Sequence, residues 1–445
     1  TINVINGSLG TTGDDNLNLT GPLGINVTAN NGHLICGGAL SLDGGVKLTN
    51  GNTGTIDGIG SDDGQSFASL NITGADTTYT GNLVVDDVLS DTPTSLSITD
   101  EGTLDGTLNI TAGNVLMDNG NGGAAVMDGG TLVVRGNDSS VVSTLDSLTV
   151  NGGVVDVTSG KLNVTNALTL GPTKGTSFTL AKGAALAADS LASSPYATAA
   201  DALHYGAYVT LNGDATVANA STLSNGIFNV GGTLTMGGDL TLKNDTVESR
   251  EVRGAEMTVR NGGTLDMGSR NISITGLSSL EVKDGGTLKL APSKTITVGG
   301  ADFGSARTEA DGNFVLYGTD AFGTGKIEGG VTLTDGTLKF NGDADISNLM
   351  SSTAADGKIF FKHDDSGSGK AGVLSVNKTL TYTGNSLELG DAAGTLQGGE
   401  LVLNTAPGGD FTMTKGTLMS LGGNSIFGPD GYTVTGYTPG ITVGG

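Results

Sequence analysis

Histidine is the side chain best suited to acid–base or metal chemistry near neutral pH, and this chain has three histidines. His33, His204 and His363 lie far apart, and no His-x-x-x-His or Cys-x-x-Cys spacing is present. His33 borders an apolar segment, and His363 precedes Asp364 and Asp365 in a loop-like stretch. We expect ordinary core and solvated histidines here, with a weak metal site at His363 as the alternative.

Adjacent carboxylates are the second candidate for chemistry, because two acids on one face can act as general acid and base. Neighbouring residues of a strand point to opposite faces, however, so a pair in sequence is not a pair in space. We therefore interpret these pairs as turn residues, with Ca²⁺ on acidic turns as the one cofactor left open. The pairs are Asp14-Asp15, Asp62-Asp63, Asp86-Asp87 and Asp364-Asp365.

Nucleotide-binding and nucleophile motifs are also missing. Ser366-Gly367-Ser368-Gly369-Lys370-Ala371 resembles half of a phosphate loop but lacks the hydroxyl after the lysine that would hold Mg²⁺. No Gly-x-Ser-x-Gly nucleophile elbow occurs. The chain has no Trp and only 4% aromatic residues, which argues against a groove that stacks sugars. We expect no enzyme and no catalytic or cofactor-binding residue, and a polysaccharide-degrading β-helix enzyme remains the third alternative.

A short glycine-rich motif, in contrast, returns along the whole chain. Leu265 and Leu288 stand 23 residues apart in two copies of Gly-Gly-Thr-Leu, and Leu132 and Val155 share the same spacing. A turn and short strand that return at a period of 20–50 residues predict a solenoid. The copies are Gly129–Leu132, Gly231–Leu234, Gly262–Leu265 and Gly285–Leu288, with relatives at Asp335–Leu338 and Lys415–Leu418.

Each repeat holds three short segments that alternate apolar and polar residues, as in Leu265–Met267, Ile272–Ile274 and Leu280–Val282. A period of two predicts a strand with one face inward. Three such strands in ~23 residues fit one triangular coil of a parallel β-helix, which gives about 18–22 coils for the chain. We therefore predict an all-β fold, a single continuous β-solenoid over residues 1–445.

Two stretches break this pattern. Residues 183–208 begin with an alanine-rich run and continue through Ser194 and Pro195, which suit a helix start. We predict a short helical excursion there, and its tyrosines Tyr196, Tyr205 and Tyr208 form a candidate interaction surface. Residues 345–371 predict a loop-rich insertion.

Composition limits the partners and the compartment. The net charge of −24 should repel nucleic acid and anionic membranes, and no apolar run is long enough for a membrane span. The single cysteine, Cys36, excludes an intrachain disulfide, and we interpret it as a small core residue. Abundant Thr, Asn, Gly and Asp favour an exported protein. No signal peptide is visible, so we expect a mature form or a fragment.

The recurring Gly-Gly-Thr-Leu-x-Leu/Met with Gly/Asn/Asp turns resembles the passenger domains of bacterial autotransporters and related β-helical surface adhesins. It is clearest at Gly129–Val134, Gly231–Met236, Gly262–Met267 and Gly285–Leu290. The resemblance implies a right-handed parallel β-helix, extracellular exposure and a spine without enzymatic role. The chain departs from the family before Gly445, where we find no barrel-like strands and expect that a barrel was removed or never present.

We expect a non-catalytic extracellular structural protein, whose stiff solenoid assembles with copies of itself into a cell-surface layer, sheath or filament. An uncapped solenoid end presents unpaired backbone groups and an apolar stripe, which favour docking of another copy. Ile2, Val4, Ile441 and Val443 lie in the terminal strands and are the candidate assembly residues. The alternative is an adhesin passenger that binds a host or glycan ligand.

Overall fold

The computed structural model describes most of the first 289 residues and, beyond them, isolated strands. No helix occurs among the described residues, and none of them forms a helix long and apolar enough to cross a membrane. The described residues are 1–10, 15–35, 38–50, 69–85, 95–138, 140–196, 206–244, 246–247, 250–251, 254–275, 278–282, 286–289 and the strands of residues 295–443 whose bounds are given below.

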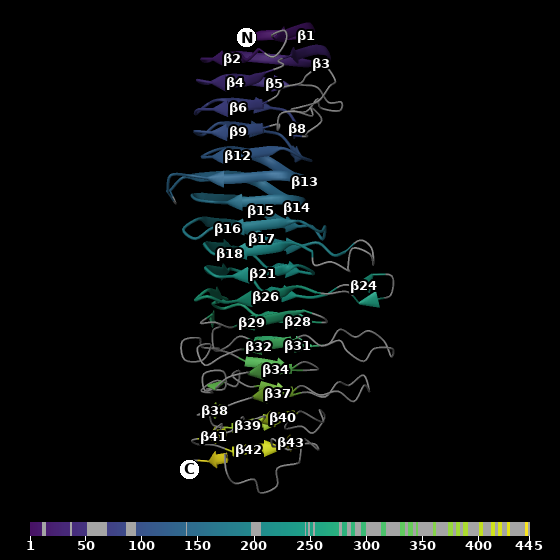
Figure 1. Ribbon diagram of the computed structural model, residues 1–445, viewed down its shortest axis with the longest axis vertical. Helices are drawn as coiled ribbons and strands as arrows, with labels where there is room; N and C mark the ends of the chain where they lie inside the picture. The colour runs from purple at the N-terminus through teal and green to yellow at the C-terminus, as the bar shows by residue number, and fades with distance from the viewer. Residues whose placement is uncertain are drawn as a thin grey trace. The chain divides into compact units, whose positions relative to one another are not determined.

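Two compact units make up the chain. Unit 1 consists of Thr1–Ala192 and Gly206–Ala215, and unit 2 consists of Ser193–Tyr205 and Thr216–Gly445. Short strands stack in parallel within each unit (Figure 1). The predicted parallel β-helix is therefore confirmed in each unit, while a single uninterrupted solenoid over the whole chain stays a prediction.

Unit 1 has three walls, which the chain visits in turn and which we number 1 to 3. Wall 1 contains β2 (Leu17–Thr20), β4 (Ala39–Asp43), β6 (Ser69–Thr73), β9 (Ser95–Thr99), β12 (Asn114–Asp118), the ends of β13 (Asn121–Arg135) and β14 (Val142–Val157), β16 (Ser177–Leu180) and β18 (Tyr208–Leu211).

Wall 2 contains the starts of the long strands together with short ones between them. Its members are the starts of β1 (Ile2–Gly10), β3 (Gly24–Ile35), β13, β14 and β15 (Lys161–Leu170), with β5 (Lys47–Asn50), β7 (Thr78–Thr80) and β10 (Thr103–Asp105). Wall 3 contains the ends of β1, β3 and β15, the middles of β13 and β14, β8 (Leu83–Val85) and β11 (Leu108–Ile110).

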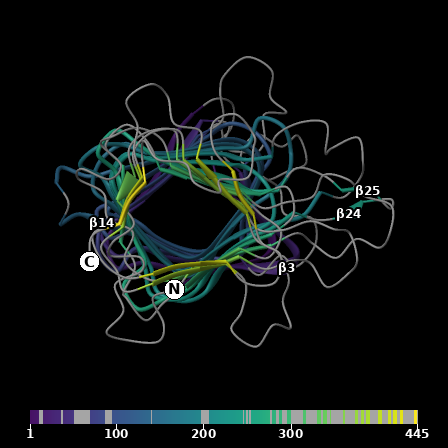
Figure 2. The same ribbon diagram turned by 90° about the horizontal axis from the view of Figure 1, so that it is seen from below.

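Long strands cross from one wall to the next. β14, for example, pairs with β15 near Leu145 and again near Leu148, and with β16 near Val155. Seen along the direction of stacking, the strands of unit 1, which run from purple to teal, form walls around its interior (Figure 2). The interior is filled by one apolar side chain per inward position, as in the fully buried row Leu40, Leu70, Leu96, Val115, Leu132, Val155 and Phe178 of wall 1.

Pairs of glycines form the corner that precedes wall 1, and this corner accounts for the Gly-Gly part of the repeat motif. Gly130 and Gly153 occupy successive levels with φ of +68° and +86°, a region that disfavours residues with a Cβ. A Cβ on Gly153 would lie 2.5 Å from the carbonyl oxygen of Gly129 and 2.6 Å from that of Gly130. Both backbone angle and close stacking therefore require glycine at this corner.

Unit 2 repeats the same architecture, and we number its walls 4 to 6. Wall 4 contains β20 (Ser221–Leu223), β23 (Leu240–Leu242), β28 (Ile272–Thr275), β31 (Thr295–Gly299), β33 (Gly330–Leu333) and β36 (Ile359–Phe361). Wall 5 contains β21 (Ile227–Val230), β26 (Glu256–Val259), β29 (Ser279–Val282), β32 (Asn313–Leu316), β34 (Thr337–Phe340), β37 (Val373–Val376), β40 (Glu400–Leu403) and β43 (Ser425–Phe427).

Wall 6 contains β22 (Thr233–Met236), β27 (Thr264–Asp266) and β30 (Thr287–Lys289). Further parallel sheets join β35 (Ala344–Asp345), β38 (Leu380–Tyr382), β41 (Phe411–Met413) and β44 (Ile441–Val443), and β39 (Ser386–Leu389) with β42 (Thr417–Ser420). The chain also contains β17 (Ala185–Ser193) and β19 (Asp214–Val217), whose residues divide between the two units.

The copies of the repeat motif stack in the register that the sequence predicts. Leu234 pairs with Leu265, and Leu265 pairs with Leu288. In unit 1, Leu132 pairs with Val155, as the 23-residue spacing requires. The motif is therefore a corner and an inward-facing strand that recur at the same place in successive coils.

The predicted helical excursion at 183–208 is wrong where the structure describes it. Residues 185–193 form β17 and residues 208–211 form β18, and none of the described residues between 183 and 208 is helical. Leu186 and Ala188 alternate with less buried neighbours, so the alanine-rich run follows the period of a strand. Residues 197–205, where the helix was expected, lie outside the described residues.

The other interruptions are described only in part. β24 (Thr246–Val247) and β25 (Arg250–Glu251) form an antiparallel hairpin that lies outside the walls of unit 2 (Figures 1 and 2). The predicted insertion at 345–371 contains β36, which pairs with β33 as a regular strand of wall 4. The remainder of that insertion, apart from Asp345, lies outside the described residues.

Candidate assembly edge and polar corner

The first coil of unit 1 has one paired side and one unpaired side. β1 pairs in parallel with β3 along Ile2–Val4 and Asn6–Gly10, and β2 pairs with β4. Within the described residues no strand pairs with the opposite side of β1 or β2. We name β1 and β2 together the first-coil edge. Its unpaired N–H and C=O groups are the kind of edge that another strand can join.

Burial changes sharply between this edge and the next coil. Leu17 and Leu19 of β2 are only half-buried, whereas their partners Leu40 and Leu42 are completely buried. Ile2 is 40% exposed, although its partner Ile25 is fully buried. The inward stripe that forms the core therefore continues to the edge, where part of it meets solvent.

Side-chain amides of the first coil bind the next coil along the chain. Asn26 donates from Nδ2 to Oδ1 of Asn3 at 2.9 Å, and the backbone N–H of Ala39 donates to Oδ1 of Asn16 at 2.8 Å. Both bonds span 23 residues, one coil of the repeat. The amide oxygens of Asn3 and Asn16 therefore accept hydrogen bonds from the next coil, and each amide nitrogen is a donor.

The predicted assembly residues fall at both ends of the chain. Ile2 and Val4 stand opposite Ile25 and Val27 in the first-coil edge. Ile441 and Val443 belong to β44, where they pair with Phe411 and Met413 of β41. The structure describes the backbone of Val4, Ile441 and Val443 but not their side chains.

The three predicted contact tyrosines do not come together as one described surface. Tyr208 begins β18 on wall 1 and is 48% exposed. Tyr196, in contrast, is only 4% exposed, so its ring is buried. Tyr205 lies outside the described residues. Of the three, Tyr208 is the one that the described structure presents at the surface.

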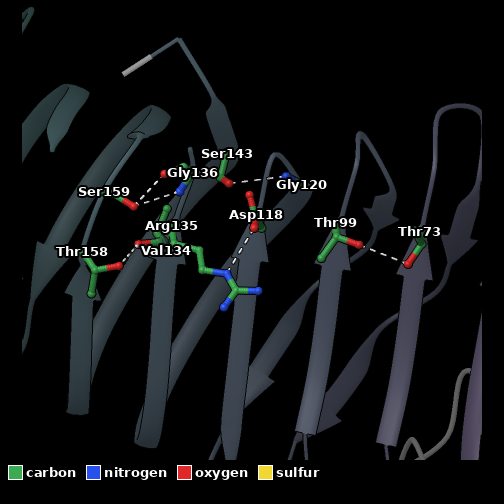
Figure 3. Close-up of polar contacts among 10 residues, drawn as sticks. All are labelled: Thr73, Thr99, Asp118, Gly120, Val134, Arg135, Gly136, Ser143, Thr158 and Ser159. Atoms are coloured by element: carbon green, nitrogen blue, oxygen red, sulfur yellow. Dashed lines mark hydrogen bonds and ion pairs between the residues drawn. The ribbon is translucent and has the colours of Figure 1, made fainter. Parts of the chain in front are cut away.

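A row of polar side chains follows the end of wall 1, where the chain leaves one strand after another (Figure 3). Thr73 and Thr99, at the ends of β6 and β9, share a hydrogen bond of 3.1 Å. On the next two strands of wall 1, Asp118 and Arg135 lie in register with Thr99 and form an ion pair of 3.1 Å. Thr158 continues the row by donating to the carbonyl oxygen of Val134.

The turns that follow this row are tied together by serine hydroxyls. Ser159 donates to the carbonyl oxygen of Gly136 at 2.8 Å and accepts the Gly136 N–H at 3.1 Å. Ser143 accepts the Gly120 N–H in the same manner. Figure 3 shows these contacts side by side along the corner. They join each coil to the next and fix its register, and they present no aligned acid, base or nucleophile.

The residues that sequence analysis examined for chemistry are not brought together in the described structure. His33 lies in β3, and its side chain is not described; Asp15 is exposed beside β2. His204, His363, Cys36 and the other paired aspartates lie outside the described residues. Among the residues that are described, no three His, Cys, Asp or Glu side chains converge as metal ligands.

Sequence reasoning missed the Asn3–Asn26 amide contact and the serine contacts at the polar corner. The signal that could have found them is the repeat itself, because these partners stand 23 residues apart. Comparison with models of protein families gives no match for this chain, and comparison with curated protein sequences gives none either.

Proposed function

We propose that the protein is a non-catalytic, extracellular structural protein that assembles with copies of itself through the first-coil edge. The observation that carries the proposal is the contrast between Leu19, which is half-buried, and its partner Leu42, which is completely buried. A strand from a second copy would pair with the open backbone groups and cover the apolar stripe at once.

The surface of the chain is consistent with this role. A net charge of −24 keeps the monomer soluble and opposes indiscriminate contact between walls. Association is then directed to an edge where hydrogen bonding and apolar burial outweigh the repulsion. A contact that repeats from copy to copy without closing on itself produces a filament, and filaments packed side by side produce a layer or sheath.

Light scattering of the purified chain tests the proposal. We expect the mean mass to rise with protein concentration, and to rise further with added salt, because salt screens the repulsion between acidic copies. Ile2→Lys should abolish this rise, since it places a charge on the exposed apolar edge. Tyr208→Lys is the matched control. Like Ile2→Lys, it replaces an exposed large hydrophobic side chain with a charged one, but Tyr208 lies on wall 1 away from the first-coil edge.

The result that contradicts the proposal is a parent chain that stays monomeric at every concentration, with and without Ca²⁺. Equal assembly of the parent and Ile2→Lys would also contradict it, because the contact would then lie elsewhere.

A second candidate function rests on the exposed Tyr208. Aromatic side chains at the surface are enriched where proteins bind partners, and the resemblance to autotransporter passengers favours an adhesin with a host or glycan ligand. Tyr208→Lys should then abolish binding to cells or to a glycan panel while Ile2→Lys leaves it unchanged. The same pair of variants therefore separates the two functions.

A further inference from the structure

The tripeptide Asn-Gly-Gly occurs three times in the chain, in different structural surroundings. An asparagine followed by glycine is the pair most prone to spontaneous deamidation, because glycine has no Cβ to hinder the approach of its backbone nitrogen to the asparagine amide. Since the three copies share these residues, the local structure decides which of them reacts. The copies begin at Asn121 and Asn151 in unit 1 and at Asn261 in unit 2.

Asn261 and Gly262 are the two central residues of a tight turn between β26 and β27. The N–H of Gly263 donates to the carbonyl oxygen of Arg260 at 2.9 Å, which closes the turn. Both central residues have positive φ, +55° for Asn261 and +77° for Gly262, as in a type I′ turn. Both are also exposed. The side-chain amide and the backbone nitrogen that would attack it therefore lie together at the surface.

The previous coil holds this turn by its two ends. The N–H of Arg260 donates to the carbonyl oxygen of Val230 at 2.9 Å, and the N–H of Thr264 donates to that of Gly232 at 2.8 Å. A Cβ placed on Gly262 would meet no atom within 4 Å. The middle of the turn therefore has space to rearrange while β26 and β27 stay paired with the previous coil.

Asn151, in contrast, is held by the coils on both sides of it. Its Nδ2 donates to Oδ1 of Asp128 at 2.9 Å, and its carbonyl oxygen accepts the hydroxyl of Thr176 at 3.0 Å. The next residue, Gly152, is buried within β14 and pairs with Asp128. Attack on this amide requires the loss of its bond to Asp128 and a local break in the strand pairing.

Asn121 starts β13 and is also part of the paired strands. Its N–H donates to the carbonyl oxygen of Gly102 at 2.9 Å, and the following Gly122 pairs with Leu145. In both copies of unit 1 the attacking nitrogen thus belongs to a paired strand, whereas that of Gly262 belongs to an exposed turn.

We propose that Asn261 is a self-modification site, at which the folded chain converts asparagine into aspartate and isoaspartate. The backbone nitrogen of Gly262 loses its proton to hydroxide and bonds to Cγ of Asn261, and the Cγ–Nδ2 bond breaks to release ammonia. Water then adds to one of the two carbonyl carbons of the cyclic imide and opens the ring. Water is the one co-reactant, and nothing is oxidised or reduced.

The product differs from the parent in charge and in the path of the main chain. Each conversion adds one negative charge, and isoaspartate also adds one methylene group to the backbone of the turn. Because the hydrogen bonds of Arg260 and Thr264 to the previous coil lie on either side of the altered bond, the coil should persist after the reaction.

Incubation of the folded chain at mildly alkaline pH, followed by trypsin digestion and tandem mass spectrometry, tests the proposal. Cleavage after Arg260 and Arg270 releases Asn261 in one peptide, and cleavage after Arg135 and Lys161 releases Asn151 in another. Asn261 should acquire the mass difference between –NH₂ and –OH at least about tenfold faster than Asn151, because Asn151 reacts only after local opening. A sample digested before incubation gives the background that arises during digestion.

The chain unfolded in guanidinium chloride supplies the comparison without a fold. There Asn261 and Asn151 should deamidate at comparable rates, since each is followed by two glycines. In the folded chain, equal rates at the two sites or a faster reaction at Asn151 would overturn the proposal. An Asn261 that stays intact when folded but reacts when unfolded would overturn it as well.

Discussion

Truncation of matched leucines at the edge and in the interior gives the sharpest prediction of the assembly model. Leu19 and Leu42 occupy the same inward position of wall 1, one coil apart. Leu42 is completely buried between coils, so Leu42→Ala should cost about 2–5 kcal/mol of unfolding free energy. Leu19 is half-buried in the monomer, so Leu19→Ala should cost roughly half as much, about 1–2 kcal/mol.

Urea unfolding followed by circular dichroism measures both costs, at a concentration where light scattering shows monomers. At higher concentration the two substitutions should affect assembly in the opposite order. Leu19→Ala should weaken assembly, because the second copy covers Leu19, whereas folded Leu42→Ala should assemble as the parent chain does. Equal unfolding costs in the monomer would refute the reasoning, since Leu19 would then be as buried as Leu42 and the edge would not be open.

Three further predictions concern the corners and turns of unit 1. Gly153→Ala and Gly175→Ala both place a Cβ at positive φ, but only Gly153 has neighbouring atoms within 4 Å of that Cβ. In urea unfolding, Gly175→Ala should lower the unfolding free energy by about 1–2 kcal/mol, and Gly153→Ala should lower it clearly more. Equal costs of the two substitutions would contradict the stacked corner. Asp118→Asn should cost less than about 1 kcal/mol, because the ion pair with Arg135 is partly exposed to solvent, and 1 M salt should remove the difference. A cost that salt does not change would contradict this prediction. The side-chain and then the backbone hydrogen bond from Ser140 lower the pKa of Asp138, so this stabilisation is present above the unfolded-state pKa and is lost as pH falls through the folded-state pKa. NMR titration should show the lowered pKa return towards an ordinary aspartate value in Ser140→Ala, and an unchanged titration would contradict the assignment.

The repeat motif was sufficient to predict the coil and its register. The 23-residue spacing of Leu132 and Val155 became a pair of stacked residues, and the Leu265–Leu288 pair did the same. This success has a physical reason: a strand of three or four residues is stable only beside a copy of itself, so the position of the copy in sequence sets its position in space.

The excursion predicted at 183–208 was wrong in its first part, because residues 185–193 continue the coil as β17, whereas residues 197–205 lie outside the described residues. In Ala184–Ala188 every residue is apolar, so periodicity does not distinguish a helix from a strand. Neighbouring strands decided the outcome, because they offer hydrogen bonds to an extended segment. Sequence alone also does not assign a strand to its wall: the similar segments Leu17–Leu19 and Leu70–Ile72 belong to wall 1, whereas Leu108–Ile110 belongs to wall 3.

Site prediction had a different limit. The sequence predicted residues of the terminal strands as assembly residues, but only burial reveals that Leu17 and Leu19 of β2 are also partly exposed at the first-coil edge. Tyr196 and Tyr208 are similar in sequence context, yet one is buried and the other exposed. Exposure depends on which coil lies above and below, and that information is not local in sequence.

Electron microscopy of the chain at assembling concentration tests the central claim most directly. We expect ordered polymers in which a second copy lies against β1 and β2, with strand spacing of about 4.8 Å continued across the contact. Isolated particles alone, or polymers in which β1 and β2 face solvent, would contradict the account.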